Sequence, residues 1–150
     1  MAQKITVLIG PPCSGKSTWA KNSLDNNTRI VSRDNIREML YGSYKMNFED
    51  EDIISEICEN ILHLLLMEGK SVIVDNTNCN IKYFKPFIEE LKKKHPHVHI
   101  EYNVFQIDED TFIERNSKRT SETGKSIPLS VFTKMNKDLE KVIEYLSYTN

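Results

Sequence analysis

The sequence has no hydrophobic run long enough to cross a membrane, because its longest apolar cluster, residues 61–67, is interrupted by His63. It also does not begin with the charged segment and apolar core of a secretory signal peptide. These two absences argue against membrane-spanning and secreted classes. They predict a cytoplasmic protein with no membrane partner.

The sequence also has few cysteines and a small net charge. The three cysteines, Cys13, Cys58 and Cys79, have no metal-site spacing, and their odd number argues against a disulfide framework. A net charge of −2 argues against broad coating of nucleic acid, but it permits a local basic pocket for one end of a strand. With 39% hydrophobic and 28% charged residues in a chain of 150, the composition predicts one globular domain, residues 1–150.

Glycine is rare as well, with five residues in the chain, yet two of them lie in one short segment. Gly10 and Gly15 belong to GPPCSGKST, which follows the apolar run 4–9 and fits the pattern G-x-x-x-x-G-K-[ST]. Between a strand and a helix, this loop turns backbone N–H groups toward a polyphosphate, with Lys16 at the β- and γ-phosphates and Ser17 on Mg²⁺. The alternative is an ordinary glycine-rich turn. We expect a nucleoside triphosphate to bind at Gly10, Pro11, Cys13, Ser14, Gly15, Lys16, Ser17 and Thr18.

Apolar runs alternate with helical patterns along the rest of the chain. This alternation predicts an α/β domain with a mostly parallel sheet, whose ligands bind beyond the carboxyl ends of the strands. The polar stretch 41–50 is expected to be a surface loop. The predicted strands are 4–9, 28–32, 71–75 and 97–105, and the predicted helices are 18–24, 33–40, 52–67, a fourth ending at 92–94 with Tyr83, Phe84, Phe87, Ile88 and Leu91 inward, 108–118, and a last one from Pro128.

Polar residues follow two of the predicted strands, 28–32 and 71–75. Asp34 is placed to accept a proton from an acceptor hydroxyl near the γ-phosphate, and Arg37, three residues on, to grip an acceptor phosphate. Alternatively, Asp34 or Ser32 caps the helix and Arg37 is solvated or paired with Asp34. Asp75 ends an apolar strand, where a carboxylate can hold Mg²⁺ through water or simply start a turn. The neighbouring Thr77 and Asn78 are candidates for the metal's water shell or for the acceptor.

Two further clusters carry charge. Arg115 and Arg119 lie four residues apart on one predicted helix face, beside a polar loop, 120–126, that is expected to move. The pair can close over a nucleotide, with one guanidinium on phosphate and the other on the base, or it can be a solvated helix end. His95, His97 and His99 recur at every second position and predict a solvent-facing start of a strand rather than a metal site.

Taken together, these segments resemble the kinase domain of bacteriophage-type 5′-polynucleotide kinases. They occur in the family's order, and the similarity continues through Ile127-Pro128 into the last helix, so it covers nearly the whole chain. The matching segments are residues 10–19 (GPPCSGKSTW), 33–37 (RDNIR), 76–80 (NTNCN) and 115–119 (RNSKR).

The resemblance implies a P-loop NTPase three-layer sandwich with a four- to five-stranded sheet and a helical lid. It also implies transfer of the γ-phosphate of ATP, with Mg²⁺, to the 5′-hydroxyl of DNA or RNA. A phage-encoded chain would act in the host cytoplasm. By position, Lys16 and Ser17 would hold phosphate and metal, Asp34 would be the general base, Arg37 would bind an acceptor phosphate, Arg115 would act at the transition state, and Arg119 would lie against the adenine.

The chain departs from that family in two ways. The family's Asp-Thr-Asn segment is here Asn76-Thr77-Asn78, with Asp75 one position earlier, so the carboxylate's metal role stays open. The Asp-x-Asp signature of the 3′-phosphatase half is missing, which predicts no end-trimming activity. A kinase of a small metabolite or nucleoside hydroxyl is the alternative, and a non-catalytic nucleotide-binding module is a third hypothesis. The oligomeric state, a homo-oligomer included, is left open.

Overall fold

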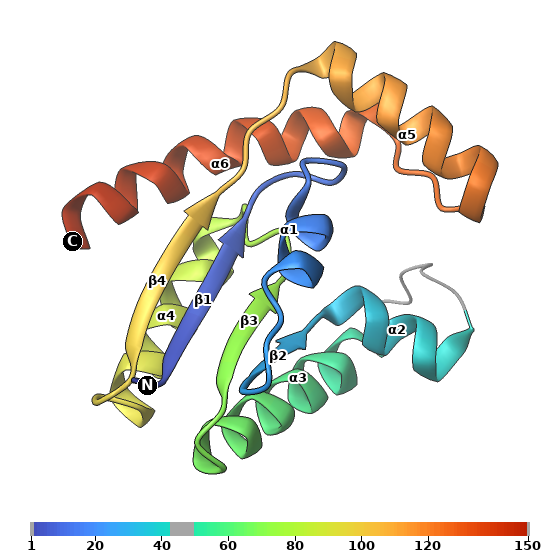
Figure 1. The fold of residues 1–150 in the computed structure, drawn as a ribbon. Coiled ribbons are helices and arrows are strands. Elements are labelled where there is room, and N and C mark those ends of the chain that lie inside the picture. Colours follow the sequence, from blue (N-terminus) through green and yellow to red (C-terminus); the bar gives the residue numbers. More distant parts are fainter. Residues whose placement is uncertain (1, 43–49, 150) are drawn as a thin grey trace.

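A parallel sheet forms the centre of the protein, as a computed structural model that describes residues 2–42 and 50–149 shows (Figure 1). Within these residues the sheet has four strands in the order β2-β3-β1-β4, and each neighbouring pair is parallel. This confirms the predicted α/β class and sheet. The strands are β1 (Lys4–Ile9), β2 (Thr28–Val31), β3 (Ser71–Asp75) and β4 (His99–Val104), and the helices are α1 (Lys16–Asn22), α2 (Arg33–Tyr41), α3 (Glu51–Met67), α4 (Ile81–Lys94), α5 (Glu109–Thr123) and α6 (Leu129–Thr149).

Helices cover both faces of this sheet, because successive strand side chains point to opposite sides. Ile5, Val7 and Ile9 of β1 pack into the main core against α3, α4 and α6, whereas Leu8 packs on the other face against Ala20 of α1. The three central layers are therefore α1, the sheet, and the α3, α4 and α6 group. β1 and β3 lie in the middle of the sheet and are almost completely buried.

A smaller apolar cluster attaches the last two helices to the loop after β1. The rings of Phe112 on α5 and Phe132 on α6 stack with centroids 4.2 Å apart, and both pack against Cys13. All three side chains are buried. This packing holds α5 beyond the carboxyl ends of the strands, on the side toward which the arrows of Figure 1 point.

Two predicted boundaries and one predicted core residue need correction, and the structure selects one of the two predicted caps of α2. Helix α1 begins at Lys16 and not at Thr18, since the glycine before it is the N-cap. Tyr83 is 68% exposed and does not point inward, because Phe84, Ile88 and Leu91 already form the buried stripe of α4. β4 starts at His99, two residues later than predicted, because the chain between it and α4 forms a turn. Ser32 rather than Asp34 caps α2, by accepting a hydrogen bond from the backbone N–H of Asn35.

The loop predicted at 120–126 is also shorter than expected, because α5 continues to Thr123. The hydroxyls of Thr120 and Thr123 bond back to the carbonyls of Asn116 and Arg119 in the helix. Gly124 ends the helix in the left-handed conformation, with φ 74°, which glycine adopts without steric cost. The predicted surface loop 41–50 falls mostly outside the described residues. No helix in the described part of the chain has the length and apolar character to span a membrane.

The three histidines do not share one strand face, contrary to prediction. His95 lies at the end of α4 and stacks on His63 of α3, with ring centroids 4.8 Å apart and Nδ1 of His63 2.6 Å from Nε2 of His95. His97 and His99 are exposed. Among the described residues, no group of three metal-ligating side chains is found.

The pairing of His63 with His95 makes the stability of the fold sensitive to acid. Burial lowers the pKa of both imidazoles, and Lys94 acts in the same direction, while Glu59 and Glu90 oppose it at His63. The unfolded chain therefore binds protons at a higher pH than the folded one. The contribution of the pair is fully present above the ordinary histidine pKa of about 6.5 and is lost as the pH falls below it.

We expect the free energy of unfolding of the wild type to fall between pH 7 and pH 5 more steeply than that of His63→Asn or His95→Gln. Urea unfolding followed by circular dichroism at each pH measures this difference. The matched control is His97→Gln, because that side chain is exposed. Parallel curves for all four proteins would show that the pair does not couple folding to protons.

Candidate active site

The loop after β1 wraps around the start of α1. Two of its residues have positive φ, Cys13 at 65° and Gly15 at 99°, and Gly15 is the N-cap of the helix. The N–H of Gly10 donates to the carbonyl of Thr77, 2.9 Å away, and so ties the loop to the end of β3. A Cβ on Gly10 would lie 2.5 Å from the carbonyl oxygen of Phe105. Glycine is thus required at Gly10 because the backbone passes close to the end of β4.

Lys16 lies inside this loop. Its Nζ donates to the carbonyls of Gly10 (2.8 Å) and Pro11 (2.7 Å) and to the hydroxyl of Ser14 (3.3 Å). Burial lowers the pKa of the ammonium to about 8, although the carboxylates of Asp75 and Asp34 act to raise it. The loop therefore presents a desolvated cation together with the first N–H groups of α1, which is a favourable environment for an anion.

A hydroxyl and a carboxylate form a hydrogen-bonded pair near Lys16. The Ser17 hydroxyl donates to Oδ2 of Asp75 over 2.8 Å, although the two residues are 58 positions apart. The parallel register of β1 and β3, which pairs Leu8 with Asp75, brings them together. A hydroxyl and a carboxylate are ligands that hard divalent cations such as Mg²⁺ accept, so this pair fits the predicted metal position.

Asp34 and Arg37 form the second half of the site, on the first turns of α2. Nη1 of Arg37 donates a hydrogen bond to Oδ1 of Asp34 over 2.6 Å. Nε and Nη2 of the same guanidinium donate to the carboxylate of Glu51 in α3, over 3.0 and 2.6 Å. The Arg37 side chain is 5% exposed. A buried guanidinium with carboxylates on two sides is held in one orientation.

Glu51 also binds a second arginine. Nη2 of Arg33 donates to its Oε1 over 3.0 Å, and Nη1 of Arg33 donates to the hydroxyl of Ser55. Hydrogen bonds to Arg37, with the nearby positive charges, hold the pKa of Glu51 below its ordinary value. Glu51 thus links α2 to α3. No sequence motif indicates this role of Glu51, since a glutamate at the start of a helix is common.

Asp34 has a second cationic partner on a distant segment. Nζ of Lys125, which follows α5, lies 2.8 Å from Oδ2 of Asp34, while Asp34 itself is 51% exposed. Burial acts to raise the pKa of Asp34, but the hydrogen bonds and charges of Lys125 and Arg37 outweigh it and keep the pKa below its ordinary value. The carboxylate is therefore ionised at neutral pH. No sequence motif indicates Lys125 either, because it lies in a polar loop.

The loop after β3 is hydrogen-bonded to the ends of the neighbouring strands. The side chain of Asn76 accepts a hydrogen bond from the N–H of Arg33 (2.9 Å), and the amide of Asn78, whose φ is 53°, donates to the carbonyl of Leu8 (2.8 Å). Thr77 accepts the N–H of Gly10 through its carbonyl. The amide of Asn78 thus contacts the backbone of β1. These contacts lock the ends of β1, β2 and β3 together. The predicted contact of Asn78 with the metal's water shell or with the acceptor stays a prediction, as does that of Thr77.

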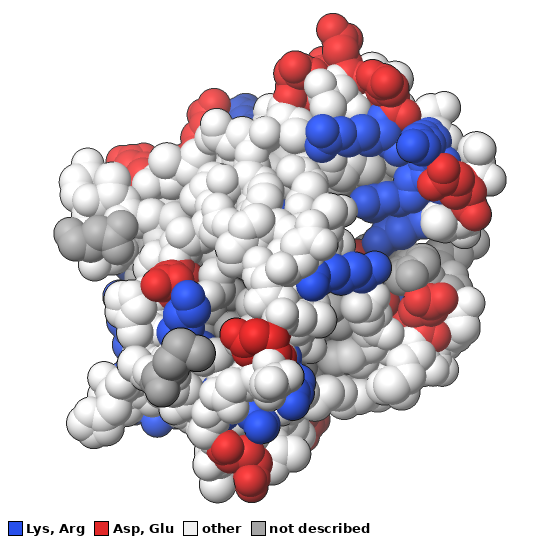
Figure 2. Space-filling view, viewed as in Figure 1, with Lys and Arg blue, Asp and Glu red and all other residues white. Residues whose placement is uncertain are grey.

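The two predicted lid arginines lie over the loop. Nη1 of Arg115 donates to the carbonyl of Cys13 over 3.0 Å, and the charge of Arg119 acts on Lys16. Both line a pocket of about 530 Å³, beside which Figure 2 shows Lys and Arg side chains gathered along α5. Trp19 packs edge-on against Phe105, with centroids 6.3 Å apart, and lines the same pocket. The pocket's other lining residues are Cys13, Gly15, Thr18, Asn22 and Phe105.

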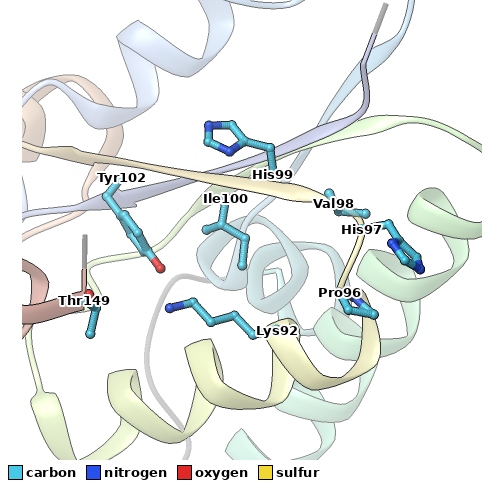
Figure 3. Close-up of a pocket in the computed structure, with 8 residues that line it drawn as sticks. All are labelled: Lys92, Pro96, His97, Val98, His99, Ile100, Tyr102 and Thr149. Atoms are coloured by element: carbon cyan, nitrogen blue, oxygen red, sulfur yellow. The ribbon is translucent and has the colours of Figure 1, made fainter.

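Another pocket, of about 420 Å³, lies at the opposite end of β4 (Figure 3). Lys92 and Tyr102 point into it, whereas His97 and His99 point away. It has no acidic side chain among its lining residues. The carboxylates of Asp34 and Asp75 lie instead at the other end of the sheet, where β2 and β3 end.

Comparisons with known proteins identify the family and the fold of the chain. The family model described as AAA domain matches residues 5–142. The chain is 30% identical to the Arabidopsis thaliana protein "Transcription factor bHLH140" over 97% of its own length, but it spans only 15% of that protein.

Solved structures show the same fold. A chain of the Pnkp1/Rnl/Hen1 RNA repair complex superposes with a TM-score of 0.86 and 29% identity, covering 96% of this chain and 46% of that one. A gluconokinase from Sinorhizobium meliloti superposes with a TM-score of 0.55 and 19% identity, over 91% of this chain and 74% of that one. The second likeness concerns the fold alone.

Replacing Glu51 should destabilise the protein more than replacing an exposed glutamate of the same helix. In Glu51→Ala the buried Arg37 guanidinium loses its two hydrogen bonds to Glu51 and keeps the one to Asp34. We expect a loss of about 2–3 kcal/mol in the free energy of unfolding, measured by urea unfolding. Glu56→Ala, at an exposed position of the same helix, is the control. Equal stability of the two variants would mean that Glu51 does not hold Arg37.

Proposed function

We propose, from the premise that this chain belongs to the AAA domain family and has the fold of a P-loop kinase, that it transfers the γ-phosphate of ATP to the 5′-hydroxyl end of DNA or RNA. The observation that carries the proposal is the Asp34–Arg37 pair, whose guanidinium is held by Glu51. The carboxylate of Asp34 lies near enough to Lys16 to act on its pKa. A proton acceptor and a phosphate-binding cation thus lie together beside the nucleotide loop.

On the donor side, the loop's N–H groups and Lys16 would bind the triphosphate. Ser17 and Asp75 would hold Mg²⁺, which supplies positive charge against the phosphate oxygens when bound. Arg115 and Arg119 would neutralise the transferring group and contact the base, and the pocket that they line is large enough for a nucleoside. Each role uses a side chain that already points toward the loop or the pocket.

On the acceptor side, Asp34 would act as general base. The hydroxyl oxygen forms a bond to the γ-phosphorus, the bond to the bridging oxygen breaks, and the hydroxyl proton passes to the Asp34 carboxylate. ADP leaves with the electron pair of the broken bond. Arg37 would bind a phosphate of the acceptor's terminal nucleotide, while Glu51 holds the Nε and Nη2 side of its guanidinium.

The comparisons support a nucleic-acid acceptor without deciding it. The neighbour in an RNA repair complex shares 29% of its residues with this chain, whereas the gluconokinase shares only 19%. A buried arginine next to the proposed base also favours an acceptor that carries a phosphate.

The first test is the identity of the acceptor. We expect the protein to transfer labelled γ-phosphate from ATP to 5′-hydroxyl DNA and RNA oligonucleotides, and not to gluconate, other sugars or free nucleosides. The same oligonucleotides with a 5′-phosphate are the control, because they have no hydroxyl to react. Transfer to a metabolite alone would replace the proposal with a small-molecule kinase, and ATP binding without transfer would indicate a non-catalytic module.

The second test separates chemistry from binding. Asp34→Asn removes the proton acceptor but keeps the size of the side chain, so kcat should fall by about 10²–10⁴-fold while the Kd for ATP stays within about twofold. Single-turnover transfer and calorimetric titration measure the two quantities. Asp52→Asn, at an exposed position on α3, should match the wild type. Comparable losses in both quantities would make Asp34 a structural residue.

A further inference from the structure

We infer that the pocket beside the first half of β4 is a second binding site, and that it takes a carboxylate attached to a small apolar group (Figure 3). This pocket, called the β4 pocket below, is lined by residues 96–100 together with Lys92, Tyr102 and Thr149. It lies at the end of the sheet opposite the nucleotide loop. The inference is therefore independent of the proposed function.

Tyr102 brings a buried hydroxyl to the β4 pocket. This hydroxyl has no hydrogen-bond partner among the residues that the structure describes. The ring is held edge-on against Phe84 of α4, with centroids 6.4 Å apart. Burial raises the pKa of the phenol, and Tyr145 acts in the same direction, so the hydroxyl is protonated at neutral pH and can donate. A buried donor without a partner costs free energy, which a bound acceptor would recover.

Lys92 brings a positive charge to the same pocket. It belongs to the last turn of α4, and its side chain points into the pocket, as that of Tyr102 does (Figure 3). Lys94 of the same turn pairs with Glu90, whereas Lys92 has no ion pair in the described part of the chain. The pocket has no acidic side chain among its lining residues. An ammonium and a phenolic hydroxyl are both donors, so the ligand that they fit is an acceptor with negative charge.

The position of the pocket limits the ligand to one negative charge. It lies at the carboxyl end of α4, where the helix dipole is negative and disfavours a highly charged anion. A single ammonium points into it, because the rings of His97 and His99 point away (Figure 3). Its lining residues include no arginine and no start of a helix, which are the usual phosphate-binding groups. A carboxylate, with one charge and two acceptor oxygens, matches one ammonium and one hydroxyl.

The remaining walls fit a small apolar body. Pro96, Val98 and Ile100 contribute apolar surface, and the volume of about 420 Å³ suits a small molecule. β4 is an edge strand of the described sheet, with β1 as its neighbour on one side, so no further described strand closes the pocket. Two sources could supply such a ligand: a free monocarboxylic acid, or the carboxyl terminus of a peptide that ends in an apolar residue.

The experiment uses hexanoate as the probe and follows the amide signals of the whole chain by NMR titration. Hexanamide has the same size without the charge, and hexyl phosphate carries a larger charge. A leucine-ended dipeptide with a free carboxylate, and the same dipeptide amidated, test the second source. The variants are Lys92→Gln and Tyr102→Phe. The matched control is Lys93→Gln, because that side chain is exposed and does not line the pocket.

We expect hexanoate to shift the signals of residues 96–102 with a Kd on the order of 1 mM. Hexanamide and hexyl phosphate should bind about tenfold more weakly. Lys92→Gln and Tyr102→Phe should each raise the Kd for hexanoate about tenfold, since each removes a hydrogen bond to a charged group. Lys93→Gln should leave the Kd unchanged. Tighter binding of the dipeptide acid than of hexanoate would identify a peptide terminus as the ligand, and the reverse order a free acid.

The stability of the free protein gives a second readout. Because the Tyr102 hydroxyl is buried without a partner, Tyr102→Phe should melt at a higher temperature than the wild type when no ligand is added. Hexanoate at about ten times its Kd should raise the Tm of the wild type and leave that of Tyr102→Phe nearly unchanged. A free Tyr102→Phe that melts below the wild type would show that the hydroxyl already has a partner, and the inference would be wrong.

Three further results would overturn the inference. The first is the absence of shifts at residues 96–102 at about fifty times the expected Kd. The second is equal binding of hexanoate and hexanamide, which would show an apolar cavity without anion recognition. The third is an equal loss of binding in Lys92→Gln and Lys93→Gln, which would reduce the effect to general surface charge. None of these measurements depends on phosphoryl transfer, so they leave the proposed function untouched.

Discussion

The parallel pairing of β1 with β3 is the contact from which the candidate active site follows. It sets Leu8 opposite Asp75, so the loop after β1 and the carboxylate that ends β3 meet at one edge of the sheet. The hydrogen bonds from Ser17 to Asp75 and from Gly10 to Thr77 then close that edge. A shift of one residue in this register would turn every side chain of β3 to the opposite face and separate the pair.

Charge at this edge is concentrated although the whole chain is nearly neutral. Lys16 is desolvated inside the loop, and Arg37 is buried between Asp34 and Glu51. Each buried cation has oxygen partners that hold it in place, which offsets part of the cost of removing it from water. Such groups are oriented before a substrate arrives, and this is the condition under which electrostatic stabilisation of a transition state is effective.

The segment after β4 adds a second constraint. The lid is α5 together with the segment 124–128 that follows it. The stacked rings of Phe112 and Phe132 anchor its helix beside Cys13. Arg115 and Lys125 reach from the lid to the carbonyl of Cys13 and to the carboxylate of Asp34. The apolar cluster therefore fixes where these two polar contacts fall.

Periodicity and close spacing are local properties, so the sequence predicts the alternation of strands and helices, the loop after β1 and the placing of Asp34 and Arg37 on one helix face. It predicts the end of α5 too early and Tyr83 inward, since packing against other elements decides where a helix ends and which side chains are buried. The fold alone shows that Glu51 holds Arg37, that Asn78 binds β1 and that Lys125 reaches Asp34. These contacts join residues up to 91 positions apart, and no local pattern encodes which distant side chains the sheet and the lid bring within hydrogen-bond distance.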